Sequence, residues 1–273
     1  MSEYSPNFTM RQLLEAGVHY GHKKNFWNPK MAQYIYGVRS GIHIIDLEQT
    51  YKLLAKALEN LQNVAAQNGR ILFVGTKKQG SDTVAEHAKR CGQYYVNYRW
   101  LPGMLTNRAT IQNSINKLKE YEGMLNDPSS LLLKKEKLEL SRKHQKLELA
   151  LGGIRNLGGL PNLIFALDTR ENDIAIQEAK KLKIPVVAIV DTNAQFDGVD
   201  YIIPGNDDAR KSIELYCKLA ADAILQGVQI SLAKSGVDIG AMSETEFVAP
   251  QANAKPIKNT DANSEQDSIP EDK

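Results

Sequence analysis

The chain is poor in cysteine and has no long apolar run. Its two cysteines among 273 residues, Cys91 and Cys217, are far apart, and neither is followed by a CxxC partner. Neither a disulfide framework nor a cysteine zinc cluster is therefore available. No window approaches about 18 uninterrupted apolar residues, and the polar start lacks the basic and apolar regions of a leader peptide. These absences predict a soluble, unexported protein of the reducing cytoplasm.

Net charge is also small, because 34 Lys and Arg residues nearly balance 32 Asp and Glu residues to give +2. The balance is uneven along the chain. The tail from Ala241 has three lysines and seven acids, a net charge of −4, which leaves +6 on the body. A tail with so few apolar groups is expected to be disordered. A modestly basic body permits nucleic-acid binding without requiring it.

Short apolar runs alternate with amphipathic segments along the body. Val, Ile and Leu runs without polar alternation are typical of strands covered on both faces, as in a parallel sheet. We therefore predict an open α/β fold. The predicted strands span residues 70–75, 94–97, 163–168, 186–191 and 201–204, and the predicted helices span 47–67, 81–91, 172–182 and 207–226.

Residues 106–151 contain no strand pattern. Apolar residues recur at helical spacing before and after the turn DPSS, with Leu133, Leu138, Leu140, Leu147 and Leu151 in the second half. Two antiparallel helices of this length would span about 30 Å and project beyond the body. Because ten Lys and Arg face six acids in residues 108–155, this hairpin is either a basic arm or an ordinary solvated face. The predicted organisation is 1–105, first part of the body; 106–152, hairpin; 153–240, second part of the body; and 241–273, tail.

Motifs for enzyme chemistry are absent or incomplete. The loop from Gly75 to Gly80 has the glycine spacing of GxxxxGK[ST], but Ser81 stands where the phosphate-binding lysine belongs. We interpret it as a strand-to-helix turn with Ser81 as the N-cap. Asp168 and Asp191 end predicted strands without a paired acid, and no GxSxG occurs. We predict no catalytic residue; a nucleotide- or phosphate-handling enzyme is the alternative.

Candidate metal ligands are few. His19 and His22 are close in sequence, and Asp191 and Asp207 follow predicted strands, but no further His or Cys stands at zinc-binding spacing. We predict no metal and no cofactor, with a divalent cation on these four residues as the alternative.

Two segments, residues 17–39 and 97–108, interleave aromatic and basic residues with glycine. Aromatic rings can stack on bases while ammonium and guanidinium groups meet phosphates, so this composition suits RNA. The alternative is a buried aromatic cluster beside solvated lysines, and Trp100 is expected to pack inside.

Six segments resemble the bacterial-type small ribosomal subunit protein two family. Their order and joint spacing match over about residues 10–229, with departures at Pro102 and Asn162, where glycine and aspartate are common. The segments are AGVHYGHKKNFWNPKM (16–31), HIIDLEQT (43–50), ILFVGTKKQ (71–79), NYRWLPGMLTN (97–107), LGGLPNLIFALDTRE (157–171) and PVVAIVDTNAQFDGVDYIIPGNDDA (185–209).

The resemblance implies a flavodoxin-like parallel sheet with helices on both faces and an inserted, protruding coiled-coil hairpin. It also implies a structural constituent of the small subunit in the cytoplasmic ribosome, with no catalytic role and no membrane partner. The implied partners are small-subunit ribosomal RNA and other small-subunit proteins, including the large multi-domain RNA-binding ribosomal protein one. A coiled-coil scaffold that dimerises through the hairpin is a further alternative.

On this hypothesis RNA is bound through phosphate contacts on a rigid body. Trp27 is included for stacking, with packing as its alternative role. The candidate RNA-binding residues are Lys23, Lys24, Trp27, Lys30, Arg99, Asn107, Arg108, Lys117, Lys134 and Lys135.

Overall fold

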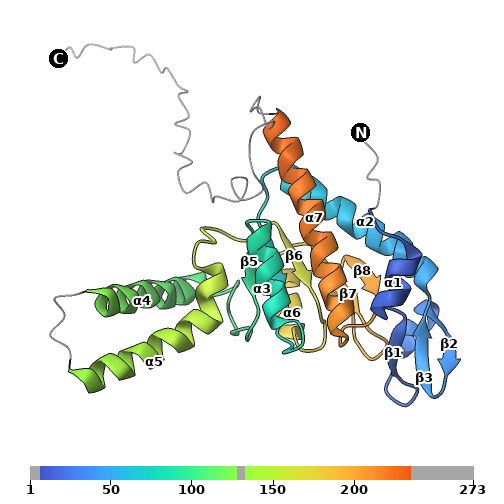
Figure 1. The fold of residues 1–273 in the computed structure, drawn as a ribbon, viewed down its shortest axis with the longest axis horizontal. Helices are drawn as coiled ribbons and strands as arrows, with labels where there is room; N and C mark the ends of the chain where they lie inside the picture. The colour runs from blue at the N-terminus through green and yellow to red at the C-terminus, as the bar shows by residue number, and fades with distance from the viewer. Residues whose placement is uncertain (1–6, 128–132, 235–273) are drawn as a thin grey trace, which may run out of the picture.

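A computed structural model describes residues 7–127 and 133–234 of the chain (Figure 1). The predicted tail, 241–273, and most of the DPSS turn lie outside the described residues. The first elements of the chain are α1 (Met10–Ala16), β1 (Tyr20–Lys23), the 3-10 helix η1 (Pro29–Tyr34), β2 (Ile35–Arg39), β3 (Ile42–Ile45) and α2 (Leu47–Ala66).

The main sheet of the described residues has five parallel strands in the order β5-β4-β6-β7-β8. When the strands are numbered in chain order from β4 to β8, their order across the sheet is 2-1-3-4-5, as in flavodoxin-like folds. The α/β prediction is confirmed, and every predicted strand is present with ends that differ by at most two residues. The strands are β4 (Ile71–Val74), β5 (Tyr94–Val96), β6 (Leu163–Ala166), β7 (Val186–Val190) and β8 (Tyr201–Pro204).

Side chains of these strands alternate between two cores, one on each face of the sheet. Phe73 and Phe165 meet at 5.3 Å between ring centroids on the face covered by α2, α3 (Ser81–Arg90) and α7 (Arg210–Lys234). Leu72 and Ile164 point to the other face, which is covered by α6 (Asp173–Lys181) and the loop after β5. Burial on both faces explains why the strands carry near-continuous apolar residues.

The N-terminal region contains a second sheet that the sequence analysis missed. Strands β1 and β2 pair with β3 in antiparallel fashion, and both ladders shift register. Short strands that contain glycine and a bulge give weak alternation, so periodicity does not detect them. Helix α1 could have been predicted from the sequence, because Thr9 and Gln12 form a capping box at its start.

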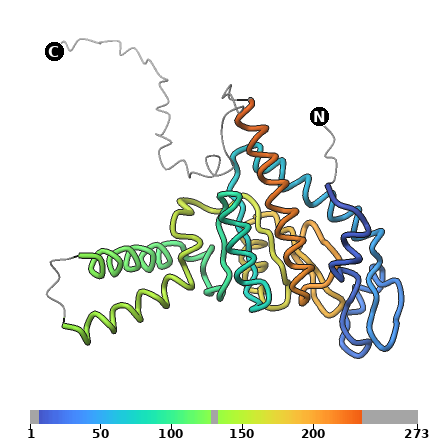
Figure 2. The backbone as a smooth tube through the Cα atoms, in the orientation of Figure 1, coloured from blue at the N-terminus to red at the C-terminus, as the bar shows by residue number. Residues whose placement is uncertain are grey.

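Helices α4 (Arg108–Asn126) and α5 (Lys134–Leu151) extend side by side from the body (Figures 1 and 2). Leu151 is buried, and Leu140 and Leu147 are half-buried. The helical spacing grouped Leu133 and Leu138 with these leucines, and that part of the prediction is wrong, because the two side chains are 70% and 53% exposed. Two residues turn an α-helix by about 200°, which places Leu138 opposite Leu140.

The N-termini of α3 and α7 differ from the predictions, α3 in its cap and α7 in its first residue. Helix α3 begins at Ser81, with Gly80 as the N-cap and no side-chain cap. The Ser81 hydroxyl instead donates to the Asn97 carbonyl at 2.8 Å, so its predicted N-cap role is wrong. Helix α7 begins at Arg210, three residues later than predicted, because the Asn206 side chain accepts the backbone N–H groups of Asp208 and Ala209 and holds a turn there.

Two structural facts bear on the absences noted in the sequence. No helix within the described ranges has the length and apolar character needed to cross a bilayer. Cys91 and Cys217 are buried free thiols. Burial raises the pKa of Cys91 to about 12, so this thiol stays protonated at neutral pH.

Candidate nucleic-acid interface

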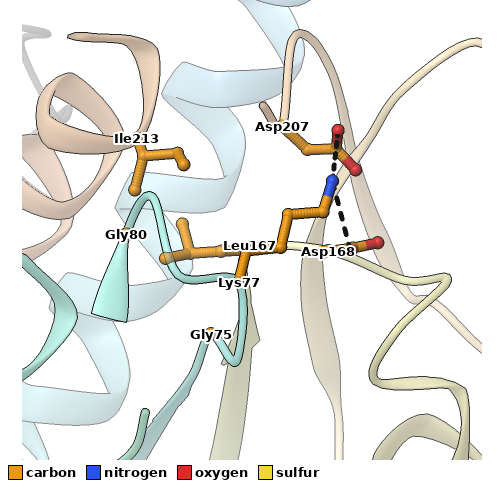
Figure 3. Close-up of a pocket in the computed structure, with 7 residues that line it drawn as sticks. All are labelled: Gly75, Lys77, Gly80, Leu167, Asp168, Asp207 and Ile213. Carbon is orange, nitrogen blue, oxygen red and sulfur yellow. Dashed lines mark ion pairs between the residues drawn. The ribbon is translucent and has the colours of Figure 1, made fainter. Parts of the chain in front are cut away.

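The carboxyl edge of the parallel sheet, where ligands bind in open α/β folds, is occupied by Lys77. This residue follows β4, and its Nζ lies 2.8 Å from Oδ1 of Asp207, 2.7 Å from Oδ1 of Asp208 and 3.3 Å from Oδ2 of Asp168. Figure 3 shows the ammonium group between Asp168 and Asp207. The lysine missing after Gly80 was noted from the sequence, but the lysine inside the loop, Lys77, was not.

Charges in this group shift one another's pKa values. Burial alone would lower the pKa of Lys77, but the Asp207 and Asp168 carboxylates outweigh it and raise that pKa. Burial, with the charges of Asp191 and Asp168, raises the pKa of Asp207 to about 8 despite the nearby ammonium. Lys77 is therefore held as a permanent internal cation.

His22 extends this network to the next strand end. Its Nδ1 lies 3.2 Å from Oδ2 of Asp191, and its Nε2 lies 3.3 Å from Oδ2 of Asp208. The hydrogen bond to Asp191, with the charges of Asp191, Asp208 and Asp207, outweighs burial and raises the pKa of His22. The imidazole thus links the antiparallel sheet to the parallel one.

This arrangement leaves no room for a phosphate in the Gly75–Gly80 loop. The enclosed cavity beside Lys77 measures about 10 Å³, near the minimum that one water molecule needs. A wider hollow of about 320 Å³ is lined by the acids Asp168, Glu171, Asp207 and Asp208 and also by Lys77, Arg170 and His22. The cations do not outnumber the acids, so the hollow offers no net positive charge to a phosphate.

The four candidate metal ligands do not form one set. His22 and Asp191 are adjacent, and Asp207 is paired with Lys77. His19 lies in a different groove with Met10 and Leu14. Among residues 7–127 and 133–234, no group of three or more His, Cys, Asp or Glu side chains could hold a metal ion.

The first group of candidate RNA-binding residues lies on and after β1. Lys23, Lys24 and Lys30 are exposed, and Trp27 is 41% exposed with its ring 5.4 Å from the His43 ring. Lys30 is already engaged, because its Nζ lies 2.8 Å from Asp197. Lys23, Lys24 and the exposed part of Trp27 are therefore the members of this group that are free of an ion pair in the described residues.

The second group flanks the loop between β5 and α4. Arg99 and Asn107 are exposed, and Asn107 is the N-cap residue of α4. Arg108 is half-buried and donates to the Gly159 carbonyl. Trp100 is 5% exposed, which confirms the expectation that it packs inside.

The third group lies on α4 and α5. Lys117 is exposed on α4, and Lys134 and Lys135 are exposed in the first turn of α5. In Figure 1 the antiparallel sheet and these two helices lie at opposite ends of the molecule. The structure therefore distributes the candidate residues over separate surfaces.

Three exposed aromatic residues close to these groups were not predicted from the sequence. Phe26 is 66%, Tyr36 82% and Tyr98 59% exposed. Each lies within a segment already noted for its aromatic and basic composition, but composition does not tell an exposed ring from a buried one.

The topology and the occupied strand-end site define a flavodoxin-like α/β protein without an open phosphate-binding loop. Comparison with known proteins gives the family. Residues 13–227 match the family model described as ribosomal protein S2. The chain belongs to the ribosomal protein S2 family.

Curated relatives agree with this assignment, and each is named small ribosomal subunit protein uS2. The relative from Wolbachia pipientis wMel is 58% identical over 245 residues, 89% of this chain and 87% of the relative. The relative from Rhodospirillum centenum is 55% identical over 252 residues, 92% of this chain and 97% of the relative. The chain is thus a structural constituent of the small ribosomal subunit and not an enzyme, and the enzyme alternative falls.

Proposed function

We propose that this chain binds small-subunit ribosomal RNA through the exposed basic residues of the three groups, with the α/β body as a rigid mount. The observation that carries this proposal is the contrast between the carboxyl edge of the sheet and the exposed periphery of the molecule. The sheet edge that binds phosphates in related topologies is closed by Lys77, whose ammonium is already paired with the buried Asp168 and Asp207. Lys23, Lys24, Arg99 and Lys117 instead lie exposed on the periphery.

The position of Lys134 and Lys135 supports the same proposal. Both lie in the first turn of α5, where the helix dipole disfavours a cation by about 0.3–1 kcal/mol. A polyanionic partner would reverse this unfavourable interaction. Such binding depends on counterion release and weakens steeply with salt.

The proposed function includes assembly in the cytoplasm and help in docking the large multi-domain RNA-binding ribosomal protein one. This second role rests on the family, and the hollow at the sheet edge, which carries charges of both signs, suits a protein contact better than an RNA contact. It is tested by comparing how much of that protein co-sediments with small subunits that contain or lack this chain.

Charge reversal tests the RNA contacts. The variant K23E/K24E/R99E/R108E should enter small subunits at least tenfold less than the native chain at physiological salt, because four phosphate contacts become repulsive. Occupancy is measured by quantitative mass spectrometry of purified subunits.

A matched pair of variants separates RNA contact from folding. Arg108→Glu also removes the bond to Gly159, so K23E/K24E is compared with K52E/K56E, which reverses two exposed lysines on α2. We expect loss of occupancy only in the first pair. Equal occupancy of both pairs would refute the assignment of Lys23 and Lys24.

A further inference from the structure

Glu178 is a buried carboxylate that faces only hydrogen-bond donors. It lies on α6 and is 8% exposed. Its Oε1 accepts from the Trp100 indole at 3.2 Å and from the Gly103 N–H at 2.7 Å. Its Oε2 accepts from the Leu105 N–H at 2.9 Å, the Thr106 N–H at 3.1 Å and the Thr106 hydroxyl at 3.2 Å.

All five donors belong to the loop between β5 and α4. This loop turns sharply at Leu101–Met104, where the Met104 N–H bonds to the Leu101 carbonyl at 3.0 Å and Gly103 has φ +86°. Pro before a glycine of positive φ is the signature of a type II turn, which accounts for Pro102. Buried N–H groups need hydrogen-bond acceptors. The carboxylate of Glu178 accepts from the N–H groups of this loop that do not bond within the turn.

A buried carboxylate is an expensive way to fill space, because an apolar side chain of similar volume costs less to desolvate. Burial alone would raise the pKa of Glu178, but the hydrogen bonds from Leu105, Gly103, Thr106 and Trp100 outweigh it and lower that pKa. The side chain therefore stays ionised at neutral pH, and its contribution is to organise the loop.

The loop carries candidate RNA contacts at both ends. Arg99 precedes Trp100 directly, and Asn107 and Arg108 follow Thr106 as the N-cap and the first residue of α4. Exposed Tyr98, Arg99 and Pro102 line an open hollow of about 400 Å³ between this loop and the start of α6. Glu178 thus holds the loop from inside while Tyr98, Arg99 and Asn107 stay exposed.

We propose that Glu178 is a positioning residue for RNA binding, which holds Arg99, Asn107 and Arg108 in place through the Trp100–Thr106 loop without touching RNA. This inference rests on the proposed function. It adds to RNA binding a residue that a search for exposed basic side chains would miss, because Glu178 is acidic and buried.

The isosteric substitution Glu178→Gln tests this proposal. Each carboxylate oxygen faces at least two donors, so the amide NH2 must point at donors in either orientation of the side chain. We expect amide exchange at Gly103, Leu105 and Thr106 to accelerate about tenfold or more, since charged hydrogen bonds are lost, while exchange in β6 and β7 stays unchanged. The measurement is hydrogen exchange by NMR on the full chain, and Glu59→Gln on the exposed side of α2 is the matched control.

RNA binding is measured with a protein-free transcript of the small-subunit RNA. We expect E178Q to bind about tenfold more weakly than the native chain and E59Q to bind equally well. In the background R99A/R108A, E178Q should cause less than a twofold further loss, because the two cationic residues that it positions are gone and only Asn107 remains. A purely structural role would give the same fold loss in both backgrounds and would overturn the proposal.

A milder variant covers the outcome in which E178Q does not fold. Thr106→Val removes one of the five donors and should weaken binding about threefold, again only when Arg99 and Arg108 are present. If R99A/R108A binds RNA as tightly as the native chain, the proposed RNA contacts themselves are wrong. If R99A/R108A binds weakly but E178Q and T106V bind normally, only the positioning role is wrong.

Discussion

At the scale of single residues, the ammonium group of Lys77 occupies the position where related folds bind an external ligand. Its ammonium lies at the switch point of the strand order, between β4 and β6, where doubly wound folds receive a ligand. The side chain is 15% exposed, and two of its carboxylate partners, Asp168 and Asp207, are nearly fully buried. The negative charge of this buried acidic cluster is therefore balanced by Lys77.

Removing this cation should therefore destabilise the protein strongly. We expect Lys77→Met to lower the free energy of unfolding by about 3 kcal/mol, because buried carboxylates lose their counter-charge. The control Lys78→Met changes the exposed neighbour and should stay within about 0.5 kcal/mol of the native chain. Urea denaturation followed by circular dichroism measures both, and equal stability of the two variants would contradict the role of Lys77.

At the scale of elements, the body depends on close contact between α2 and α7. A Cβ atom added at Gly227 of α7 would collide with the Gln62 carbonyl oxygen and approach the Ala65 Cβ to 2.7 Å. The glycine thus permits the two helix backbones to meet. By contrast, Gly123 lies on the exposed side of α4 with nothing within 4 Å of its added Cβ.

These two glycines predict opposite effects of the same substitution. Gly227→Ala should destabilise the chain by about 1–3 kcal/mol, because the clash with α2 exceeds the gain in helix propensity. Gly123→Ala should stabilise α4 by up to about 1 kcal/mol, since only the propensity changes. Thermal unfolding of both variants measures the shifts, and a stabilised G227A would show that α2 and α7 are not closely packed.

Elements also differ in how well local sequence predicts them. The buried strands β4, β6 and β7 were predicted because sheet burial on both faces leaves an uninterrupted apolar run. Strands β1 to β3 were not, because their pairing is completed by tertiary contacts such as the bond from the His22 N–H to the Thr192 hydroxyl.

At the scale of the whole molecule, the strand-end network couples stability to pH. The pKa of His22 is raised, so its contribution is complete below about 6.5 and is lost as pH rises through the folded pKa. The pKa of Asp207 is raised to about 8, so the folded chain retains a proton that the unfolded chain releases, and stability falls as pH rises toward 8. Both groups act in the same direction.

We therefore expect the free energy of unfolding to fall by about 2–3 kcal/mol between pH 6 and pH 9, at about 1.36 kcal/mol for each pH unit over which the folded chain keeps the extra proton. Asp207→Asn should flatten this fall, because one of the two linked protons is removed while Asp168 and Asp208 still hold Lys77. Asp82→Asn, which changes an exposed acid on α3, should keep the native profile. Urea titrations at several pH values give the slopes, and a native profile that is flat from pH 6 to 9 would rule out this linkage.

The amino-acid sequence by itself determined the α/β class, the order of the main strands and helices, and the family, because apolar periodicity and segment order are local properties of the chain. Tertiary structure alone decided which charged groups meet. Lys77 reaches Asp207 across 130 positions of sequence, and Glu178 reaches a loop more than 70 positions earlier. It also decided which aromatic rings stay exposed. Partners so distant are chosen by the packing of strands and helices around the sheet, and no local pattern records that choice.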